Sequence, residues 1–151
     1  MKALTLWQPY ATLVALGVKR WETRSWRTEH RGPLAIHAAA RMPREARALC
    51  EQPAFRYALR AVPRPFVLGA VVAIVDLQPC RATESLLDQL DLGFGANDGL
   101  LSQFPFGDFT PGRFAWPLGN IRRLINPIPA LGAQTLWEWN APADLEARLA
   151  V

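Results

Sequence analysis

The residues with the clearest chemical potential lie in one short run near the N-terminus, residues 17–24, with the sequence GVKRWETR. An ammonium, a carboxylate and a guanidinium occur there at Lys19, Glu22 and Arg24. Such a set could supply an acid, a base and a phosphate clamp, or could bind a polyanion without reacting with it. Only two of the 17 basic residues are lysines, at positions 2 and 19. The lone internal lysine indicates a need for a compact, titratable point charge rather than a guanidinium fork.

A helix and a strand are predicted to position this run. Pro9 can start a helix without losing a hydrogen bond, residues 10–16 continue it, and Gly17 supplies a left-handed cap. Residues 19–26 contain tryptophan, threonine and glutamate in alternation, which predicts a strand that leaves this cap. The glycine therefore places Lys19 at the mouth of that strand.

Alternation along this strand decides which side chains share a face. Glu22, Arg24 and Trp26 are expected on one face, and Trp21 and Thr23 on the opposite face. The charged face should form a cleft in which the ammonium, the carboxylate and the guanidinium meet. Because exposed cleft charges contribute little to stability, removing Lys19 or Arg24 is expected to weaken ligand binding and leave folding nearly intact, whereas removing Glu22 should leave phosphate affinity unchanged or raise it. An exposed ion pair on an edge strand would account for the same spacing.

Polar and aromatic residues elsewhere could complete a site. His37, at the end of a predicted strand, could act as a general acid or base, or could be a hydrogen-bonded core residue. Gln8, beside the start of the first helix, could read a base edge. Trp7, Trp26 and Trp116 could stack on a base. Packing in the core is favoured for each of them except Trp26, which shares a face with Glu22 and Arg24. Two histidines and two cysteines without ligand spacing predict no metal site, and no cofactor is expected.

Composition and charge define the broad class of protein. The 151 residues are half apolar and one-fifth charged, which predicts one globular domain over residues 1–151. The net charge of +4 is unevenly distributed, since residues 1–64 carry a surplus of basic residues and residues 65–151 a surplus of acidic ones. A basic half favours a polyanionic partner, although a solvated arginine-rich helix surface would have the same composition.

No membrane segment is predicted. The longest apolar run, residues 66–75, is well short of the roughly 20 residues that a membrane-spanning helix needs. The N-terminus resembles a signal peptide only weakly, because Gln8-Pro9 interrupts its apolar part. A cytoplasmic protein with two reduced cysteines, Cys50 and Cys80, is expected.

The remaining chain predicts an α+β domain around a small, partly open barrel. Apolar and β-branched patterns predict strands at residues 2–6, 19–26, 33–37, 66–77 and 113–125. Helices are expected at residues 9–16, 43–59 with a break at Pro53, 83–91 and 142–149. Residues 93–112, with five glycines, predict a long loop pinned to the body by Phe94, Phe104, Phe106 and Phe109.

The spacing Gly17-x-Lys19-x-x-Glu22-x-Arg24 resembles the GxKxxExR motif of the ASCH family. Residues 31–38, 106–116 and 127–137 resemble later blocks of the same family, so the likeness spans roughly residues 3–139. The resemblance implies a PUA-like, partly open β-barrel of five to six strands with short helices packed on one side. It also implies a cleft that binds RNA or a nucleotide. Arg113, in the second of these blocks, is a further candidate binding residue.

Two other functions remain open. Some small members of the family resemble amidohydrolases that act on N-acetylated cytidine, with the motif lysine as base and a threonine as nucleophile. Lys19 and Glu22 would be the catalytic residues here, although Glu22 occupies the position of that threonine. Ribonuclease activity by the same residues is a related possibility, and a protein-interaction domain that uses the phenylalanine-rich loop is another. An RNA- or nucleotide-binding module is the leading prediction, and the sequence leaves the oligomeric state open.

Overall fold

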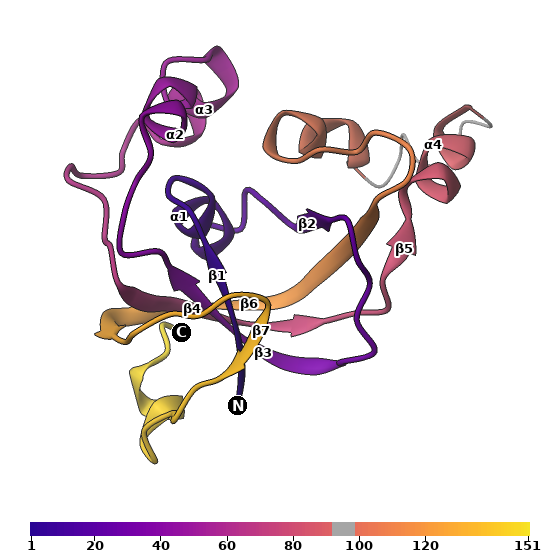
Figure 1. Ribbon diagram of the computed structural model, residues 1–151. Helices are drawn as coiled ribbons and strands as arrows, with labels where there is room; N and C mark the ends of the chain where they lie inside the picture. The colour runs from indigo at the N-terminus through magenta and orange to yellow at the C-terminus, as the bar shows by residue number, and fades with distance from the viewer. Residues whose placement is uncertain (92–98) are drawn as a thin grey trace.

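The computed structural model describes residues 1–91 and 99–151, which form one mixed sheet with short helices (Figure 1). Seven strands are assigned in this part of the chain, in the order β2-β6-β4-β3-β1-β7, with β5 paired to β6. The strands are β1 (Lys2–Leu6), β2 (Trp21–Arg24), β3 (Gly32–Ala38), β4 (Ala70–Leu77), β5 (Arg81–Ala82), β6 (Phe114–Pro129) and β7 (Leu136–Glu138). The sheet has more strands than expected because β5 and β7 are only two and three residues long, too short to leave a period in the sequence.

The central strand is β4, as the apolar run predicts. Seven of its eight residues are buried, and it pairs antiparallel with β3 on one side and with β6 on the other. The strand begins at Ala70 rather than at residue 66, since Gly69 adopts a φ of +63° and turns the chain immediately before it. Residues 66–69 instead connect the helices to the sheet.

The curvature of the sheet comes from β6. This strand of 16 residues pairs with β2 and β5 through its first part and with β4 along most of its length. Two register shifts interrupt its pairing with β4, and such bulges bend and twist a strand. Figure 1 shows the resulting curl, in which β2 rises away from the layer of β3 and β4. The α+β, partly open barrel that the sequence predicts is confirmed.

Most helices lie above the sheet in the view of Figure 1, and the C-terminal segment lies below it. Proline breaks the second predicted helix as expected, since Pro53 is the first residue of α3. The helical segments are α1 (Tyr10–Ala15), α2 (Arg44–Leu49), α3 (Pro53–Ala58), α4 (Thr83–Asp91) and the 3₁₀ segments η2 (Leu100–Phe106) and η3 (Leu145–Arg148). Within the described residues, none of these helices is long and apolar enough to cross a membrane.

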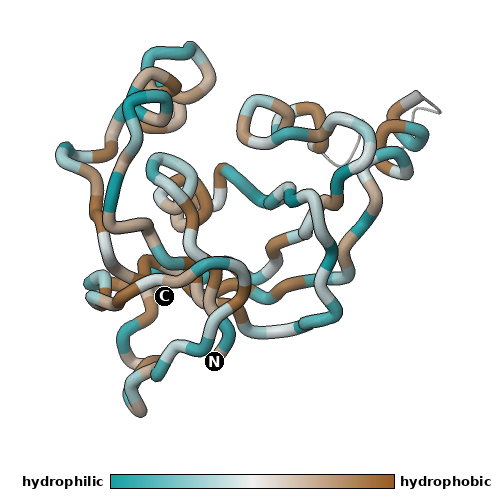
Figure 2. Tube along the Cα trace, in the orientation of Figure 1, coloured by the Kyte–Doolittle hydropathy of each residue, from teal (hydrophilic) through white to brown (hydrophobic). Residues whose placement is uncertain are grey.

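The core lies between α1 and the sheet, where Figure 2 shows hydrophobic segments along the central strands. Trp116 of β6 is completely buried there. A second cluster joins α1, α3 and η2 through Leu13, Phe55, Leu59 and Phe106. The phenylalanines of the predicted loop do hold it to the body, because Phe106 and Phe109 are buried and Phe104 packs against Phe109. Phe94 lies outside the described residues.

Candidate functional site

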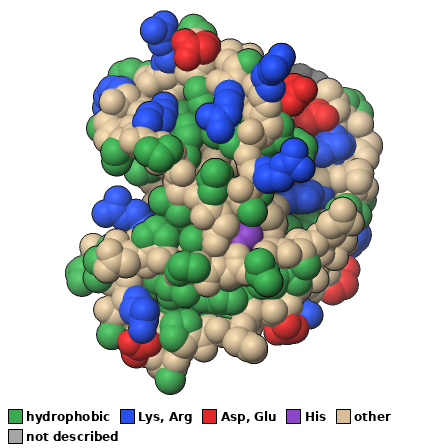
Figure 3. Space-filling view, turned by 60° about the vertical axis from the view of Figure 1, so that its left-hand side comes forward, with side chains coloured by type: hydrophobic (Ala, Val, Ile, Leu, Met, Phe, Trp, Pro, Cys, Tyr) green, Lys and Arg blue, Asp and Glu red, His purple; other side chains and the backbone are tan. Residues whose placement is uncertain are grey.

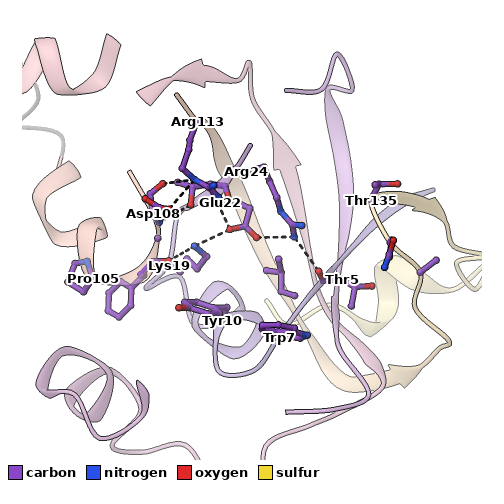
Figure 4. A pocket seen from close by; sticks show the side chains of 16 residues that line it. Thr5, Trp7, Tyr10, Lys19, Glu22, Arg24, Pro105, Asp108, Arg113 and Thr135 are labelled. Atoms are coloured by element: carbon purple, nitrogen blue, oxygen red, sulfur yellow. Dashed lines mark hydrogen bonds and ion pairs between the residues drawn. The ribbon is translucent and has the colours of Figure 1, made fainter. Parts of the chain in front are cut away.

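A cleft of about 830 Å³ opens between α1, β2 and the end of η2 (Figure 4). Four separate parts of the chain form its walls, and five of its side chains are charged. Its lining is Thr5, Leu6, Trp7, Tyr10, Lys19, Glu22, Thr23, Arg24, Pro105, Phe106, Gly107, Asp108, Arg113, Ala133, Gln134 and Thr135. A volume of this size is typical of pockets that hold a small organic ligand or a nucleotide.

Lys19 lies at the bottom of this cleft and is only 1% exposed. Gly17, with a φ of +75°, turns the chain after α1, so that the N–H of Lys19 donates to the carbonyl of Leu13 at 3.0 Å. Its Nζ donates to the carbonyls of Trp21 at 2.7 Å and Phe106 at 2.5 Å, and lies 3.4 Å from Oε1 of Glu22. All three ammonium protons therefore have an acceptor.

This burial has two consequences for Lys19. Desolvation lowers the pKa of its ammonium, while the negative charge of Glu22 opposes that shift. The expectation that replacing Lys19 leaves folding nearly intact assumed an exposed charge, whereas the structure buries this ammonium against three acceptors. We therefore expect its removal to destabilise the fold, because its buried partners would be left unpaired.

Glu22 joins the other two charged residues of the motif. Its Oε1 accepts a hydrogen bond from the backbone N–H of Thr23 at 2.9 Å, and its Oε2 lies 3.3 Å from Nη2 of Arg24. The same Nη2 of Arg24 donates to the carbonyl of Thr5 on β1 at 3.3 Å. The structure thus brings the ammonium, the carboxylate and the guanidinium together in one cleft (Figure 4).

A second charged pair, Arg113 and Asp108, lies beside this group. Arg113 donates to the carbonyl of Asp108 at 3.1 Å and to that of Thr23 at 3.3 Å, and its Nε lies 3.5 Å from the Asp108 carboxylate. Hydrogen bonds from Thr110, with a smaller contribution from Arg113, lower the pKa of Asp108. The side chain of Thr23 also faces this segment, since its Oγ1 accepts from the N–H of Asp108 at 3.0 Å. Thr23 lines the cleft together with Glu22, because residues 105–108 fold over the strand.

The aromatic wall differs from the one expected. Trp7 lines the cleft and is 57% exposed, and Tyr10 lies beside it. Burial of Tyr10 and, to a smaller extent, the charge of Glu22 raise the pKa of its phenol, so the hydroxyl remains a donor. Trp26 and Trp116 do not line the cleft. They pack edge to face at 4.8 Å, and the Nε1 of Trp116 donates to the carbonyl of Trp26 at 3.2 Å.

Gln8 lies in the interior rather than in the cleft. Its side chain is fully buried, its Nε2 donates to the carbonyl of Val67 at 2.8 Å, and its Oε1 accepts from the N–H of Thr12 at 3.0 Å. These bonds tie the beginning of α1 to the segment before β4. Because the amide is fully buried, it is not accessible to a base edge in this arrangement.

His37 is also buried, at 1% exposure, and does not line the cleft. The Nε1 of Trp137 donates to Oγ1 of Thr5 at 3.0 Å, and that hydroxyl lies 3.1 Å from Nδ1 of His37. The Nε2 of His37 lies 2.8 Å from the carbonyl of Ala130, which can only accept. The carbonyl of Ala130 requires a proton on Nε2, and the pKa of the imidazole, lowered by burial, favours the neutral form. His37 therefore orients Thr5, a residue of the cleft wall, and stands behind the site rather than in it.

The burial of His37 predicts that the stability of the fold depends on pH. Burial lowers its pKa below the ordinary value of 6.5. The unfolded chain then binds a proton that the folded chain does not, so stability is lost as the pH falls below 6.5. Between pH 7.5 and pH 5.5 the loss should be up to about 1.4 kcal/mol in urea unfolding, and His37→Gln should remove it. His30→Gln is the control for losing a histidine, and equal pH slopes in the parent and in His37→Gln would contradict this account.

The cleft contains residues that the sequence did not single out, including Thr5, Tyr10, Gln134 and Thr135. The first two lie close to Gln8 in the chain, but only the pairing of β1 with β7 brings the last two to the same place. Over residues 1–91 and 99–151, no group of three or more His, Cys, Asp or Glu side chains could hold a metal ion.

Fold, motif and sequence comparison agree on the class of protein. Residues 4–103 match the ASCH domain family, and the chain belongs to this family. It is 36% identical over 90 residues to activating signal cointegrator 1 of Homo sapiens, and 34% identical to that of Mus musculus. The matched region is 57% of this chain and 15% of each of these relatives, so the chain spans only a small part of their length.

Solved structures support the fold. The ASCH protein from Zymomonas mobilis superposes with a TM-score of 0.53 at 16% identity, covering 99% of this chain and 95% of that one. A substituted variant of the same protein gives a TM-score of 0.53 at 15% identity, over 99% and 98% of the two chains. At this level of identity the likeness concerns the fold alone.

Proposed function

We propose that the cleft binds a nucleotide of single-stranded RNA. The observation that carries this proposal is the position of an exposed tryptophan, Trp7, beside the charged group of Lys19, Glu22 and Arg24. An aromatic face with an adjacent guanidinium is the combination that recognises an unstacked base and its phosphate. The ASCH family, to which the chain belongs, is also associated with RNA binding.

Each group in the cleft has a role that follows from its chemistry. Trp7 stacks on the base, because over half of its surface is free for contact. Glu22 retains acceptor capacity and accepts a hydrogen bond from an exocyclic amino group, as acidic side chains do with cytosine. Arg24 and Arg113 contact the phosphate, since their side chains are 27% and 28% exposed on the cleft walls.

The hydrogen bonding of Lys19 favours binding over amide hydrolysis. A lysine that acts as a base must lose a proton and reach the reacting group. In this structure its ammonium donates to two carbonyls and lies against Glu22, and it is 1% exposed. Lys19 therefore positions Glu22 and the segment at Phe106, and the ligand contacts the groups around it. The phenylalanine-rich loop is a weaker basis for a protein-interaction site, because Phe106 and Phe109 are buried.

The proposal predicts a charge-dependent loss of affinity. Each phosphate contact to a single strand changes the slope of log K against log salt by about 0.7, which corresponds to about fivefold in affinity at 0.1 M salt. Arg24→Gln and Arg113→Gln should each weaken binding of a fluorescent 12-residue oligocytidylate by about fivefold. Each should also make the salt slope shallower by about 0.7, as measured by anisotropy titrations.

Arg27→Gln is the matched control, because Arg27 is exposed, pairs with Glu29 and lies outside the cleft. It should leave affinity and slope close to those of the parent. If Arg27→Gln weakens binding as much as Arg24→Gln, the RNA responds only to net charge and the cleft is not its site.

A further inference from the structure

A second groove of about 760 Å³ lies on the helical part of the molecule, away from the charged group of the first cleft. It is formed by α2, α3 and the segment that leads to β4. Its lining is Met42, Arg47, Cys50, Glu51, Arg56, Leu59, Arg60, Val62, Arg64, Pro65, Phe66 and Leu68. Figure 3 brings this side of the molecule forward and shows basic side chains gathered over its upper part, where α2 and α3 lie.

The charge of this groove is strongly one-sided. Four arginines, Arg47, Arg56, Arg60 and Arg64, line it with a single carboxylate, Glu51. All four are exposed, and among the described residues none of them forms an ion pair with a carboxylate. Like charges so close together, without acidic partners, favour a polyanionic ligand.

Two of these guanidinium groups are held in place without being neutralised. Arg60 lies 4.0 Å from the centre of the Tyr57 ring and donates to the Tyr57 carbonyl at 2.7 Å. Arg64 lies 4.0 Å from the centre of the Phe66 ring and donates to the carbonyl of Val62 at 2.9 Å. Aromatic stacking and one backbone bond fix each group while leaving other N–H donors free for a phosphate. The ring of Tyr57 is itself 70% exposed, and it offers a base a stacking surface at the edge of the groove.

Packed side chains connect the groove to the cleft. Phe55 of α3 packs between Tyr10 and Phe106, at ring distances of 6.0 and 5.1 Å, and both of these residues line the cleft. Gln8, the residue after Trp7, is bonded to the carbonyl of Val67, beside the Leu68 that lines the groove. Trp7 of the cleft and Leu68 of the groove are thus linked through the bond between Gln8 and Val67, and Trp7, Val67 and Leu68 are all exposed.

We infer that this arginine groove binds the phosphate backbone of a single-stranded RNA whose next nucleotides enter the cleft. This inference rests on the proposed function of the cleft and extends it, since it names a strand rather than a free nucleotide as the ligand. Phosphates along the groove contact the guanidinium groups, and a flanking base stacks on Tyr57. The length of RNA then determines the affinity, because only an oligomer reaches both sites.

Two probes test the groove separately from the cleft. Cytidine 5′-monophosphate reports on the cleft alone, and a 12-residue oligocytidylate reports on both sites. The double variant Arg47→Gln/Arg60→Gln should weaken oligomer binding by about 25-fold at 0.1 M salt and make the salt slope shallower by about 1.4. It should leave the affinity for the mononucleotide unchanged within about twofold, because one phosphate cannot occupy both sites.

The matched control is Arg44→Gln/Arg123→Gln, which removes the same charge from exposed positions on α2 and β6 outside the groove. If this control weakens the oligomer as much as the groove variant does, or if the groove variant binds the oligomer like the parent, the inference is overturned. If the groove variant loses oligomer affinity but no variant or parent binds the mononucleotide, the groove stands as a phosphate site and the proposed function of the cleft fails.

Discussion

Replacing Lys19 by methionine should lower the free energy of unfolding by about 3–5 kcal/mol, the usual cost of removing one partner of a buried ion pair. Methionine fills much of the same space, so the loss reflects charge and hydrogen bonding rather than a cavity. The carbonyls of Trp21 and Phe106 would lose their donor, and Glu22 would lose one of its two cations. Urea unfolding monitored by circular dichroism measures the change.

Lys2→Met is the matched control, since Lys2 is the only other lysine and forms an exposed pair with Glu138. Such pairs contribute about 0–1 kcal/mol, so this variant should unfold nearly as the parent does. A loss below about 1 kcal/mol in Lys19→Met would mean that the ammonium is not held as the structure shows.

Replacing Trp7 by alanine should weaken oligocytidylate binding by about 5- to 150-fold, the range that corresponds to 1–3 kcal/mol for one base stacked on an aromatic side chain. Its folding should change little, because the side chain is 57% exposed. Trp7→Phe should restore most of the affinity, because it retains an aromatic face. Both variants can be compared by anisotropy at fixed salt.

Leu131→Ala is the control for losing an exposed apolar side chain, as Leu131 is 94% exposed and outside the cleft. If Trp7→Ala binds the oligomer as tightly as the parent does, no base stacks on Trp7. Failure of Trp7→Phe to recover affinity would mean that the indole N–H, and not the ring face, makes the contact.

Much of the fold could be predicted from apolar runs, prolines and glycines in the sequence. The apolar run around β4 predicted a strand covered on both faces, and Pro53 predicted the break between α2 and α3. Gly17 predicted the turn that delivers Lys19 to its position. The short strands β5 and β7 could not be predicted, because two or three residues show no period and are ordered only by their neighbours.

The site was only partly predictable for a related reason. The motif spacing predicted that Lys19, Glu22 and Arg24 come together, but it could not show which of them is buried. Trp26 does not share the cleft with Glu22 and Arg24, as strand alternation predicted, since β2 ends at Arg24 and the chain bends before the tryptophan. Thr23 lines the cleft although alternation placed it on the opposite face, because the segment at Asp108 covers that face of the strand.

His37 and Gln8 illustrate a limit of reading polar residues in isolation. Gln8 lies near the motif, and His37 lies at the end of a strand. In either position, a polar side chain can contact a ligand or form a hydrogen bond within the protein. The structure gives each side chain two hydrogen-bonding partners within the protein. Their contribution to the site is to orient Thr5 and the start of α1.

A crystal structure with cytidine 5′-monophosphate tests the central claim most directly. The account predicts that the nucleotide occupies the cleft, with its base against Trp7 and an amino group about 2.7–3.2 Å from the carboxylate of Glu22. Its phosphate should lie against Arg24 or Arg113. A nucleotide bound elsewhere at saturating concentration, with the cleft unoccupied, would contradict the account.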